Sequence, residues 1–478
     1  MSRGRLVVHA HFYQPFRVDP FTGRIPDDPS AAPFRNWNER ITAECYRPIA
    51  ELGIPAHISW NLGATLTDYL AREAPAVLRR FADLDRAGGG TGMAQSFHHS
   101  ILPLASLADR RTEIGWGLRD FEWRFGRRPT AMWLPETAVD LATLRVAAEQ
   151  GVTGVILAPW QADSSHVDTR QPYRIDVGGG RDVTAMFYDG ELSGAVSFEP
   201  AATADADRFA RERVAPRLAG TLPNGGDPTL VIATDGELYG HHQSFRDLFL
   251  QRLVAPGAAD YRSFDVVGFQ AAIAGDGGAP HPEMRIRERT SWSCHHGVLR
   301  WTAECPDVPD GRWKGPLRAA LERLAGAIDS LTEGLARDLG TLDVWAARDR
   351  YVDVIIGAQE GDAFAAACLG RRSSPDTRAR LLALMEAQRW RLGMFASCGW
   401  FWEDPVRIET HQVLRAAARA VRLVDGLAGT ALEARLLADL ETFRSPATGM
   451  DGASIYGAAL RAVGQPLPRP RRRASRAG

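Results

Sequence analysis

Thr229-Leu230-Val231-Ile232-Ala233-Thr234 is a short apolar run, and Asp235-Gly236-Glu237 follows it directly. A continuous apolar run that is bounded by turn residues predicts a strand buried on both faces. Gly236 permits a tight turn or a close backbone approach, so both acids can be presented where the strand ends. The stretch therefore predicts a parallel sheet with titratable groups at the carboxyl end of a strand.

Similar strand-like runs occur elsewhere and alternate with helical patterns, at residues 6–11, 56–61, 130–134 and 154–158. This alternation predicts a β/α barrel or a doubly wound sheet. Polar residues follow the runs, namely His11, Asn61, Glu136 and Asp235. A doubly wound sheet collects its site at one switch point, whereas a barrel collects it from the ends of many strands. We therefore expect an α/β fold with an incomplete barrel.

The character of the sequence changes from about residue 309, where apolar residues recur at helical spacing. We expect a barrel domain at residues 1–305 and an α-helical bundle domain at residues 306–463. Residues 464–478 are rich in Pro and Arg and lack apolar periodicity, which predicts a disordered basic tail. A nucleic-acid arm is the alternative interpretation of that tail.

The overall composition is that of a soluble enzyme. The 478 residues carry a formal net charge of −1, which gives no reason to expect nucleic acid or a membrane surface as a partner. The 5 cysteines are scattered without a CxxC pair, which argues against a disulfide framework and against a structural zinc site. We expect a cytoplasmic protein without a cofactor, and the sequence leaves its oligomeric state open.

A second acidic segment, Trp133-Leu134-Pro135-Glu136, follows another predicted strand. Pro135 fixes the exit angle of the chain, and Trp133 offers a flat wall to a sugar ring. Two carboxylates on separate strands are what glycoside cleavage needs: one attacks the sugar and the other shuttles the proton of the leaving oxygen. Glu136 and Asp235 are the candidates, although a Glu can also stabilise the first turn of the next helix.

Histidines, glutamines and aromatic residues surround the acids in sequence and suit a sugar-binding cleft. The predicted substrate-binding residues are His9, His11, Gln14, Gln95, His99, Trp133, Trp160, Glu237, His241, Trp292, His295 and Trp301. His9 and His11 lie on the same side of a strand, so they also allow a metal-dependent alternative. That alternative is a deacetylase or mannosidase-like enzyme with His9, His11 and Asp235 as ligands. A non-catalytic glucan-binding protein is the third possibility.

In this order the segments resemble the motifs of glycoside hydrolase family 57. The resembling segments are His9–Pro15, Gly92–Gln95, Trp133–Glu136, Asp235–His242 and Ser291–Trp301, and they span roughly residues 6 to 301. The specificity of the match rests on order and spacing. The helical half resembles an uncharacterised C-terminal domain that is attached to one subgroup of the family.

The resemblance implies an incomplete seven-stranded barrel, followed by a helical region. It also implies chemistry on α-glucans (oligosaccharides or polysaccharides), with retention of configuration and without a metal. Glu136 would be the nucleophile and Asp235 the general acid/base, in an amylase, a branching enzyme or a 4-α-glucanotransferase. His11, Trp133 and Glu237 would contact the substrate or support the site. Gln95 departs from the family, which commonly has Glu there, so the resemblance does not carry over a particular specificity.

Overall fold

The computed structural model describes residues 4–223, 226–256, 262–274, 281–340 and 343–465. The chain forms two compact units. The first contains residues 1–14 and 27–297, and the second contains residues 15–26 and 298–478. Most of the predicted basic tail lies outside the described residues, so its disorder stays a prediction.

The first unit is built on one sheet, whose strands run in the order β6-β7-β5-β4-β3-β2-β1-β8, with β9 paired to β1. The strands are β1 (Arg5–Phe12), β2 (Ser59–Leu62), β3 (Gly92–Gln95), β4 (Ala131–Trp133), β5 (Gly154–Leu157), β6 (Tyr173–Gly178), β7 (Arg181–Phe187), β8 (Thr229–Asp235) and β9 (Asp265–Val266). Among the named strands of the described residues, the β6–β7 pair is antiparallel and the other pairs are parallel. In the described part of the chain β7 and β8 do not pair with each other, so the predicted incomplete barrel is confirmed.

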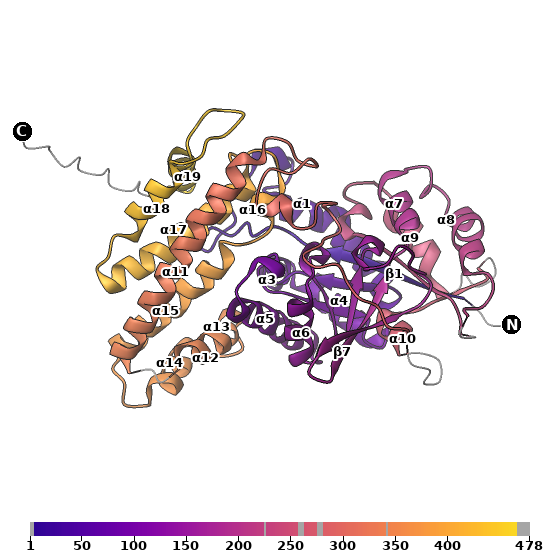
Figure 1. Cartoon of the computed structure of the whole chain (residues 1–478), viewed down its shortest axis with the longest axis horizontal. Helices are drawn as coiled ribbons and strands as arrows, with labels where there is room; N and C mark the ends of the chain where they lie inside the picture. Colours follow the sequence, from indigo (N-terminus) through magenta and orange to yellow (C-terminus); the bar gives the residue numbers. More distant parts are fainter. Residues whose placement is uncertain (1–3, 224–225, 257–261, 275–280, 341–342, 466–478) are drawn as a thin grey trace, which may run out of the picture. The chain divides into compact units, whose positions relative to one another are not determined.

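Helices follow most of these strands in the chain, as the alternating pattern predicted (Figure 1). They are α1 (Trp37–Ile41), α2 (Arg47–Glu51), α3 (Ala64–Glu73), α4 (Pro75–Ala87), α5 (Leu107–Phe125), α6 (Leu141–Glu149), α7 (Gly190–Phe198), α8 (Ala206–Phe209), α9 (Arg246–Val254) and α10 (Phe269–Ile273). A side chain caps the start of several of them: Ser106, Asp140 and Asp189 each accept a backbone N–H of the first turn. These caps fix where the helices begin, and therefore the lengths of the loops that carry the polar residues.

The strand register brings residues that are far apart in the sequence to the same level of the sheet. His11 on β1 is the register partner of Asn61 on β2 and of Asp235 on β8. Gln95 on β3 pairs in the same way with Trp133 on β4. Because these strands are parallel, their carboxyl ends meet at one edge, and this edge carries the candidate site.

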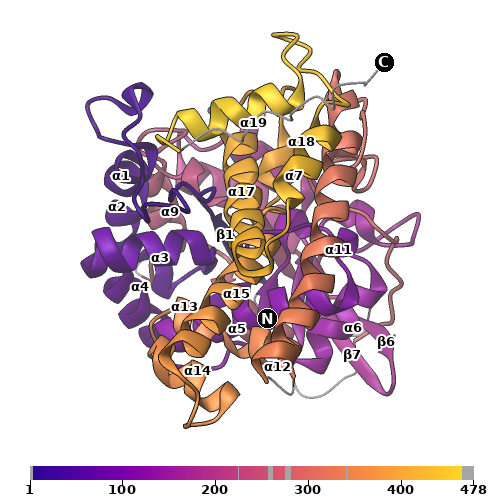
Figure 2. The ribbon, with the colours of Figure 1, turned by 90° about the vertical axis from the view of Figure 1, so that its left-hand side faces the viewer.

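The second unit is helical, as predicted. Its helices are α11 (Lys314–Leu339), α12 (Val344–Arg350), α13 (Val352–Ile355), α14 (Gly361–Leu369), α15 (Pro375–Gly393), α16 (Cys398–Phe401), α17 (Ile408–Ala428), α18 (Leu432–Leu440) and α19 (Gly452–Arg461). The long helices α11, α15 and α17 pack against one another (Figure 2). Within the described ranges, no helix combines the length and the apolar character that crossing a bilayer requires.

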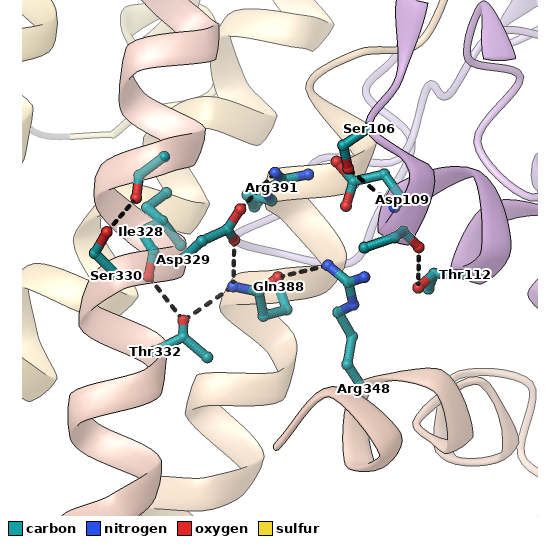
Figure 3. Close-up of polar contacts among 12 residues, drawn as sticks. Ser106, Asp109, Thr112, Ile328, Asp329, Ser330, Thr332, Arg348, Gln388 and Arg391 are labelled. Atoms are coloured by element: carbon teal, nitrogen blue, oxygen red, sulfur yellow. Dashed lines mark hydrogen bonds and ion pairs between the residues drawn. The ribbon is translucent and has the colours of Figure 1, made fainter. Parts of the chain in front are cut away.

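A buried polar network joins three of these helices (Figure 3). Gln388 on α15 is fully buried, and its amide nitrogen donates to Asp329 and Thr332 of α11 at 3.0 and 2.9 Å. Its amide oxygen accepts a hydrogen bond from Arg348 of α12 at 3.4 Å. Such satisfied polar contacts specify one arrangement of packed helices.

Candidate active site

The two candidate carboxylates leave the sheet at the same edge. Asp235 is the last residue of β8, and Glu136 lies in the 3-10 turn η5 (Pro135–Thr137), which follows β4 after one residue. The strands in front of them are buried, so the apolar runs hold the backbone and the acids come at the end. This is the arrangement that parallel β/α sheets use for catalytic groups.

Glu136 has a backbone conformation that is rare for its residue type. Its φ is 57° and its ψ is 20°, and the next residue, Thr137, has a φ of 46°. Left-handed backbone is uncommon outside glycine, and it is an outlier for a β-branched residue such as Thr. Strain of this kind persists only where the surroundings determine the conformation, and it gathers at functional sites.

The carboxylate of Glu136 is held by two side-chain donors. The indole N–H of Trp292 donates to Oε2 at 3.1 Å, and the hydroxyl of Ser293 donates to the same oxygen at 2.7 Å. The backbone N–H of Trp292 also donates to the carbonyl of Glu136 at 3.0 Å. These bonds favour the ionised carboxylate and fix its direction, which suits a nucleophile.

Asp235 has the opposite electrostatic setting. The residue stays accessible at the end of β8, while the protein packed around its carboxyl group displaces water. This desolvation, together with the negative charge of Glu136, raises the pKa of Asp235 to about 7. The carboxyl group therefore holds a proton near neutral pH, as a general acid must.

Glu237 lies two residues after Asp235 and is buried. Its Oε1 accepts hydrogen bonds from the hydroxyl of Tyr46 at 2.7 Å and from the backbone N–H of Tyr13 at 3.0 Å. Burial raises the pKa of Glu237 to about 8, although the hydrogen bond from Tyr46 opposes the shift. With Oε1 committed to these partners, Glu237 is placed to support the site.

A π-helical turn, Thr42–Tyr46, contacts the segment after β8 through three successive side chains. Glu44 lies 2.6 Å from Nδ1 of His241, the thiol of Cys45 donates to the carbonyl of Gly236 at 3.5 Å, and Tyr46 contacts Glu237. π-helical turns often mark functional positions. Here the turn holds the segment that follows Asp235, and the Nδ1 of the predicted binding residue His241 is already engaged.

The two histidines of β1 stack on Trp133. The ring of His9 lies 4.5 Å from that of Trp133 and the ring of His11 lies 5.1 Å from it. Asn61 Oδ1 is 3.1 Å from Nε2 of His9 and from Nδ1 of His11. Burial lowers the pKa of His9 to about 3 and that of His11 to about 4, so both rings are neutral. Trp133 is fully buried, and both histidine rings pack on it.

The remaining polar residues of the first half gather around this stack. Asn61 Nδ2 donates to Oε1 of Gln95 at 2.5 Å, while Nε2 of Gln95 and Nε1 of Trp133 have no hydrogen-bond partner among the described residues. His99 stacks on Tyr13 at 3.8 Å and on His11 at 5.4 Å. The two unpaired donors belong to register partners on β3 and β4, and both atoms are buried.

Aromatic residues gather around the segment 291–295, which donates hydrogen bonds to Glu136. Trp160 is half-buried, donates its indole N–H to the carbonyl of Ser291 at 2.9 Å, and lies 5.5 Å from the ring of His295. Trp292 packs edge-on against Trp133 at 4.9 Å. Trp301 belongs to the second unit, and its side chain is fully buried. Gln14 is buried just after β1.

The metal-dependent alternative requires ligand atoms of His9, His11 and Asp235 to converge. In the part of the chain that the structure describes, these three do not form such a group. The imidazole nitrogens that face Asn61 are occupied by its amide. The geometry therefore does not favour that alternative.

Residues 30–258 match the profile described as Glycosyl hydrolase family 57, and residues 310–465 match a profile described as Domain of unknown function (DUF3536). The chain belongs to glycosyl hydrolase family 57. No curated protein matches the sequence.

Solved structures share the fold of this family 57 chain. An exo-type maltose-forming amylase from Pyrococcus sp. ST04 is 15% identical, with a TM-score of 0.74, and the match covers 95% of this chain and 88% of that one. A GH57-type branching enzyme from Pyrococcus horikoshii is 14% identical, with a TM-score of 0.58 and coverages of 92% and 88%. The α-amylase AmyC from Thermotoga maritima is 14% identical, with a TM-score of 0.55 and coverages of 95% and 99%.

The sequence did not reveal which residues hold the side chains of this family 57 site in place by hydrogen bonds. Asn61 was expected at the site, but its bridge between the two histidines follows only from the register of β1 and β2. Tyr46 and Glu44 precede the strand β2 in the chain, and no motif marks them. Gln161, which contacts Thr137, follows Trp160 directly, so its position next to a predicted binding residue was the only available signal.

Proposed function

We propose that this family 57 enzyme cleaves or transfers α-glucosidic bonds with retention of configuration. The observation that supports this proposal best is the difference between the surroundings of its two carboxyl groups. Glu136 receives hydrogen bonds from Trp292 and Ser293, whereas desolvation and the charge of Glu136 keep a proton on Asp235. Two carboxyl groups with separated protonation states are the equipment of a retaining glycosidase.

In the proposed reaction Glu136 attacks the anomeric carbon as the glucosidic bond breaks. Asp235 gives its proton to the departing oxygen, and a covalent glucosyl–enzyme ester forms at Glu136. Asp235, now a carboxylate, takes a proton from water or from the hydroxyl group of an acceptor sugar. That oxygen displaces Glu136, so hydrolysis and transfer share the first step.

The surroundings support an α-glucan as the substrate. The half-buried rings of Trp160 and Trp292 suit the apolar face of a glucose unit, and the buried, unpaired donors of Gln95 and Trp133 keep the edge of the sheet beneath them polar. The similar solved structures reported above are a maltose-forming amylase, a branching enzyme and an α-amylase. We assign His9 and Glu237 to support, and His11, His99, His241 and His295 to the lining of the site.

The proposed compartment is the cytoplasm. The scattered spacing of the five cysteines, which include no CxxC pair, supports a reducing environment.

The test uses the two carboxyl variants on maltooligosaccharides and glycogen, with products resolved by size and linkage. Glu136→Gln and Asp235→Asn should each abolish turnover. Added azide should then separate the roles in the alanine variants. Asp235→Ala should yield an α-glucosyl azide, because azide attacks the covalent intermediate, whereas Glu136→Ala should yield the β-anomer. Near-wild-type turnover by Glu136→Gln would sink the proposal.

A further inference from the structure

The turn that carries Glu136 needs something to hold it. Glu136 and Thr137 are consecutive residues with φ values of 57° and 46°. Neither is glycine, and the β-branched side chain of Thr137 makes its left-handed conformation costly. Without external contacts, such a turn would relax and redirect the carboxylate.

One side chain meets Thr137 on both its backbone and its side chain. Gln161 is fully buried at the end of the 3-10 turn η6 (Pro159–Gln161), which follows β5. Its Nε2 donates to the carbonyl of Thr137 at 2.9 Å, and its Oε1 accepts the hydroxyl of Thr137 at 2.9 Å. This two-point contact fixes the position of the turn and the rotamer of Thr137 together.

The amide of Gln161 is itself held in place. Oε1 accepts the backbone N–H of Ala158 at 2.8 Å, and Nε2 also donates to the hydroxyl of Thr290 at 3.3 Å. These four bonds satisfy both donors and both acceptor positions of the side chain. Because every donor and acceptor position of the Gln161 amide is used within the protein, the amide has none left to bind a substrate, and its role is structural.

Thr290 extends this contact to the segment that binds the carboxylate. Its backbone exchanges hydrogen bonds with Val139 at 2.9 and 3.2 Å, and Trp292 follows it two residues later. Gln161 therefore contacts the turn that carries Glu136. It also contacts the segment that contains Trp292, whose indole donates to the carboxylate of Glu136.

We propose that Gln161 is a positioning residue for the nucleophile. Its amide holds the left-handed turn Glu136–Thr137, so that the carboxylate stays aimed at the anomeric carbon. This inference rests on the proposed role of Glu136. It adds a residue that contacts neither the sugar nor the carboxylate.

The experiment measures how fast Glu136 is esterified. An activated fluoroglucoside that forms a long-lived glucosyl–enzyme is added to the full-length protein, and the labelled fraction is followed by mass spectrometry. Gln161→Leu should label roughly 10- to 100-fold more slowly than wild type, because small displacements of a reacting group cost factors of this size. KM for a maltooligosaccharide should stay within about twofold, because ground-state binding is untouched.

Thr137→Val is the milder variant, since it keeps the shape and removes only the hydroxyl that Gln161 accepts. It should fold and label several-fold more slowly, and it decides the matter if Gln161→Leu does not fold. The matched control is Gln388→Leu in the helical unit, where a fully buried glutamine loses three hydrogen bonds (Figure 3). Its melting temperature should fall, while labelling per folded molecule should not change.

Wild-type labelling rates in both Gln161→Leu and Thr137→Val would overturn the inference and leave the proposed function intact. A shared slowing in Gln388→Leu would also overturn it, because general destabilisation would then explain the effect. Failure of the proposed function looks different: Glu136→Gln would still turn over, or the label would sit on another residue.

Discussion

Trp292 donates two hydrogen bonds to Glu136, from its indole to the carboxylate at 3.1 Å and from its backbone amide to the carbonyl at 3.0 Å. The two residues are 156 positions apart in the chain. The aromatic segment after the sheet therefore holds both the carboxylate and the backbone carbonyl of Glu136. Its sequence alone indicated only a sugar platform.

The first prediction concerns this contact. Trp292→Phe keeps an aromatic ring and removes the indole N–H, so kcat should fall roughly tenfold, since a hydrogen bond to a charged group contributes about 1.5–3 kcal/mol. Ser293→Ala should act in the same direction, and the double variant should lose less than the product of the two effects, because both donors serve one oxygen. Initial rates on a maltooligosaccharide measure this. Trp123→Phe, at an exposed ring of α5, is the control.

The second prediction concerns pH. Asp235 must be protonated to act as the acid, and its pKa is raised to about 7, so kcat/KM should fall about tenfold per pH unit above pH 7. Part of the shift comes from the charge of Glu136. In Glu136→Gln the pKa of Asp235 should therefore drop, as measured by carbon NMR of labelled aspartate. An unchanged value would contradict the electrostatic coupling of the pair.

The third prediction concerns the hydroxyl of Tyr46. Tyr46→Phe removes a donor from the buried carboxyl group of Glu237, so the pKa of Glu237 should rise further and the free energy of unfolding should fall by about 1–3 kcal/mol. Urea unfolding at pH 7 measures the loss. Tyr173→Phe is the control, since its part-buried hydroxyl contacts backbone atoms of Asp168 at 3.1 Å and the side-chain amide of Gln171 at 3.3 Å, and none of these partners is charged. Backbone partners can turn to water, so this control should lose less.

The fourth prediction concerns stability in acid. The pKa values of His9 and His11 are lowered from 6.5 to about 3 and about 4. Below pH 6.5 both histidines are therefore protonated in the unfolded chain but stay neutral in the folded chain. The free energy of unfolding therefore decreases as the pH falls. Each histidine contributes about 1.4 kcal/mol per pH unit in that window.

Asp235 and Glu237 act in the opposite sense, because their pKa values are raised and their contribution is lost as pH rises. The histidine effect must therefore be measured as a difference. Between pH 6.5 and 5, His9→Gln should lose about 2 kcal/mol less stability than the wild type. Equal losses in denaturant unfolding of the two proteins would show that His9 is not held neutral.

The sequence predicted the elements whose signals are local. Apolar runs followed by acids placed β4 and β8 and their carboxylates, and helical spacing predicted the second unit. What depends on register was out of reach. The bridge of Asn61 between His9 and His11, and the contact of Gln161 with Thr137, require knowledge of which strands are neighbours.

Trp301 shows the limit of reasoning from composition. It stands in a segment dense in Trp and His, which suggested a binding platform. The chain passes from one unit to the other between residues 297 and 298, so neighbours in this segment serve different cores. Density of residue types could not reveal that division.

The path of residues 15–26 makes the two units topologically interleaved. After strand β1 the chain enters the helical unit with the twelve residues 15–26. Residues 27–297 then form the rest of the barrel unit. There Phe16 packs on Trp390, and Phe21 lies beneath Arg419 and Arg422. Deleting residues 298–478 would therefore leave residues 15–26, which begin three residues after β1, without the unit they pack in. The barrel cannot be released as an independent enzyme by a single cut, and any exchange of domains with a relative has to move two segments together.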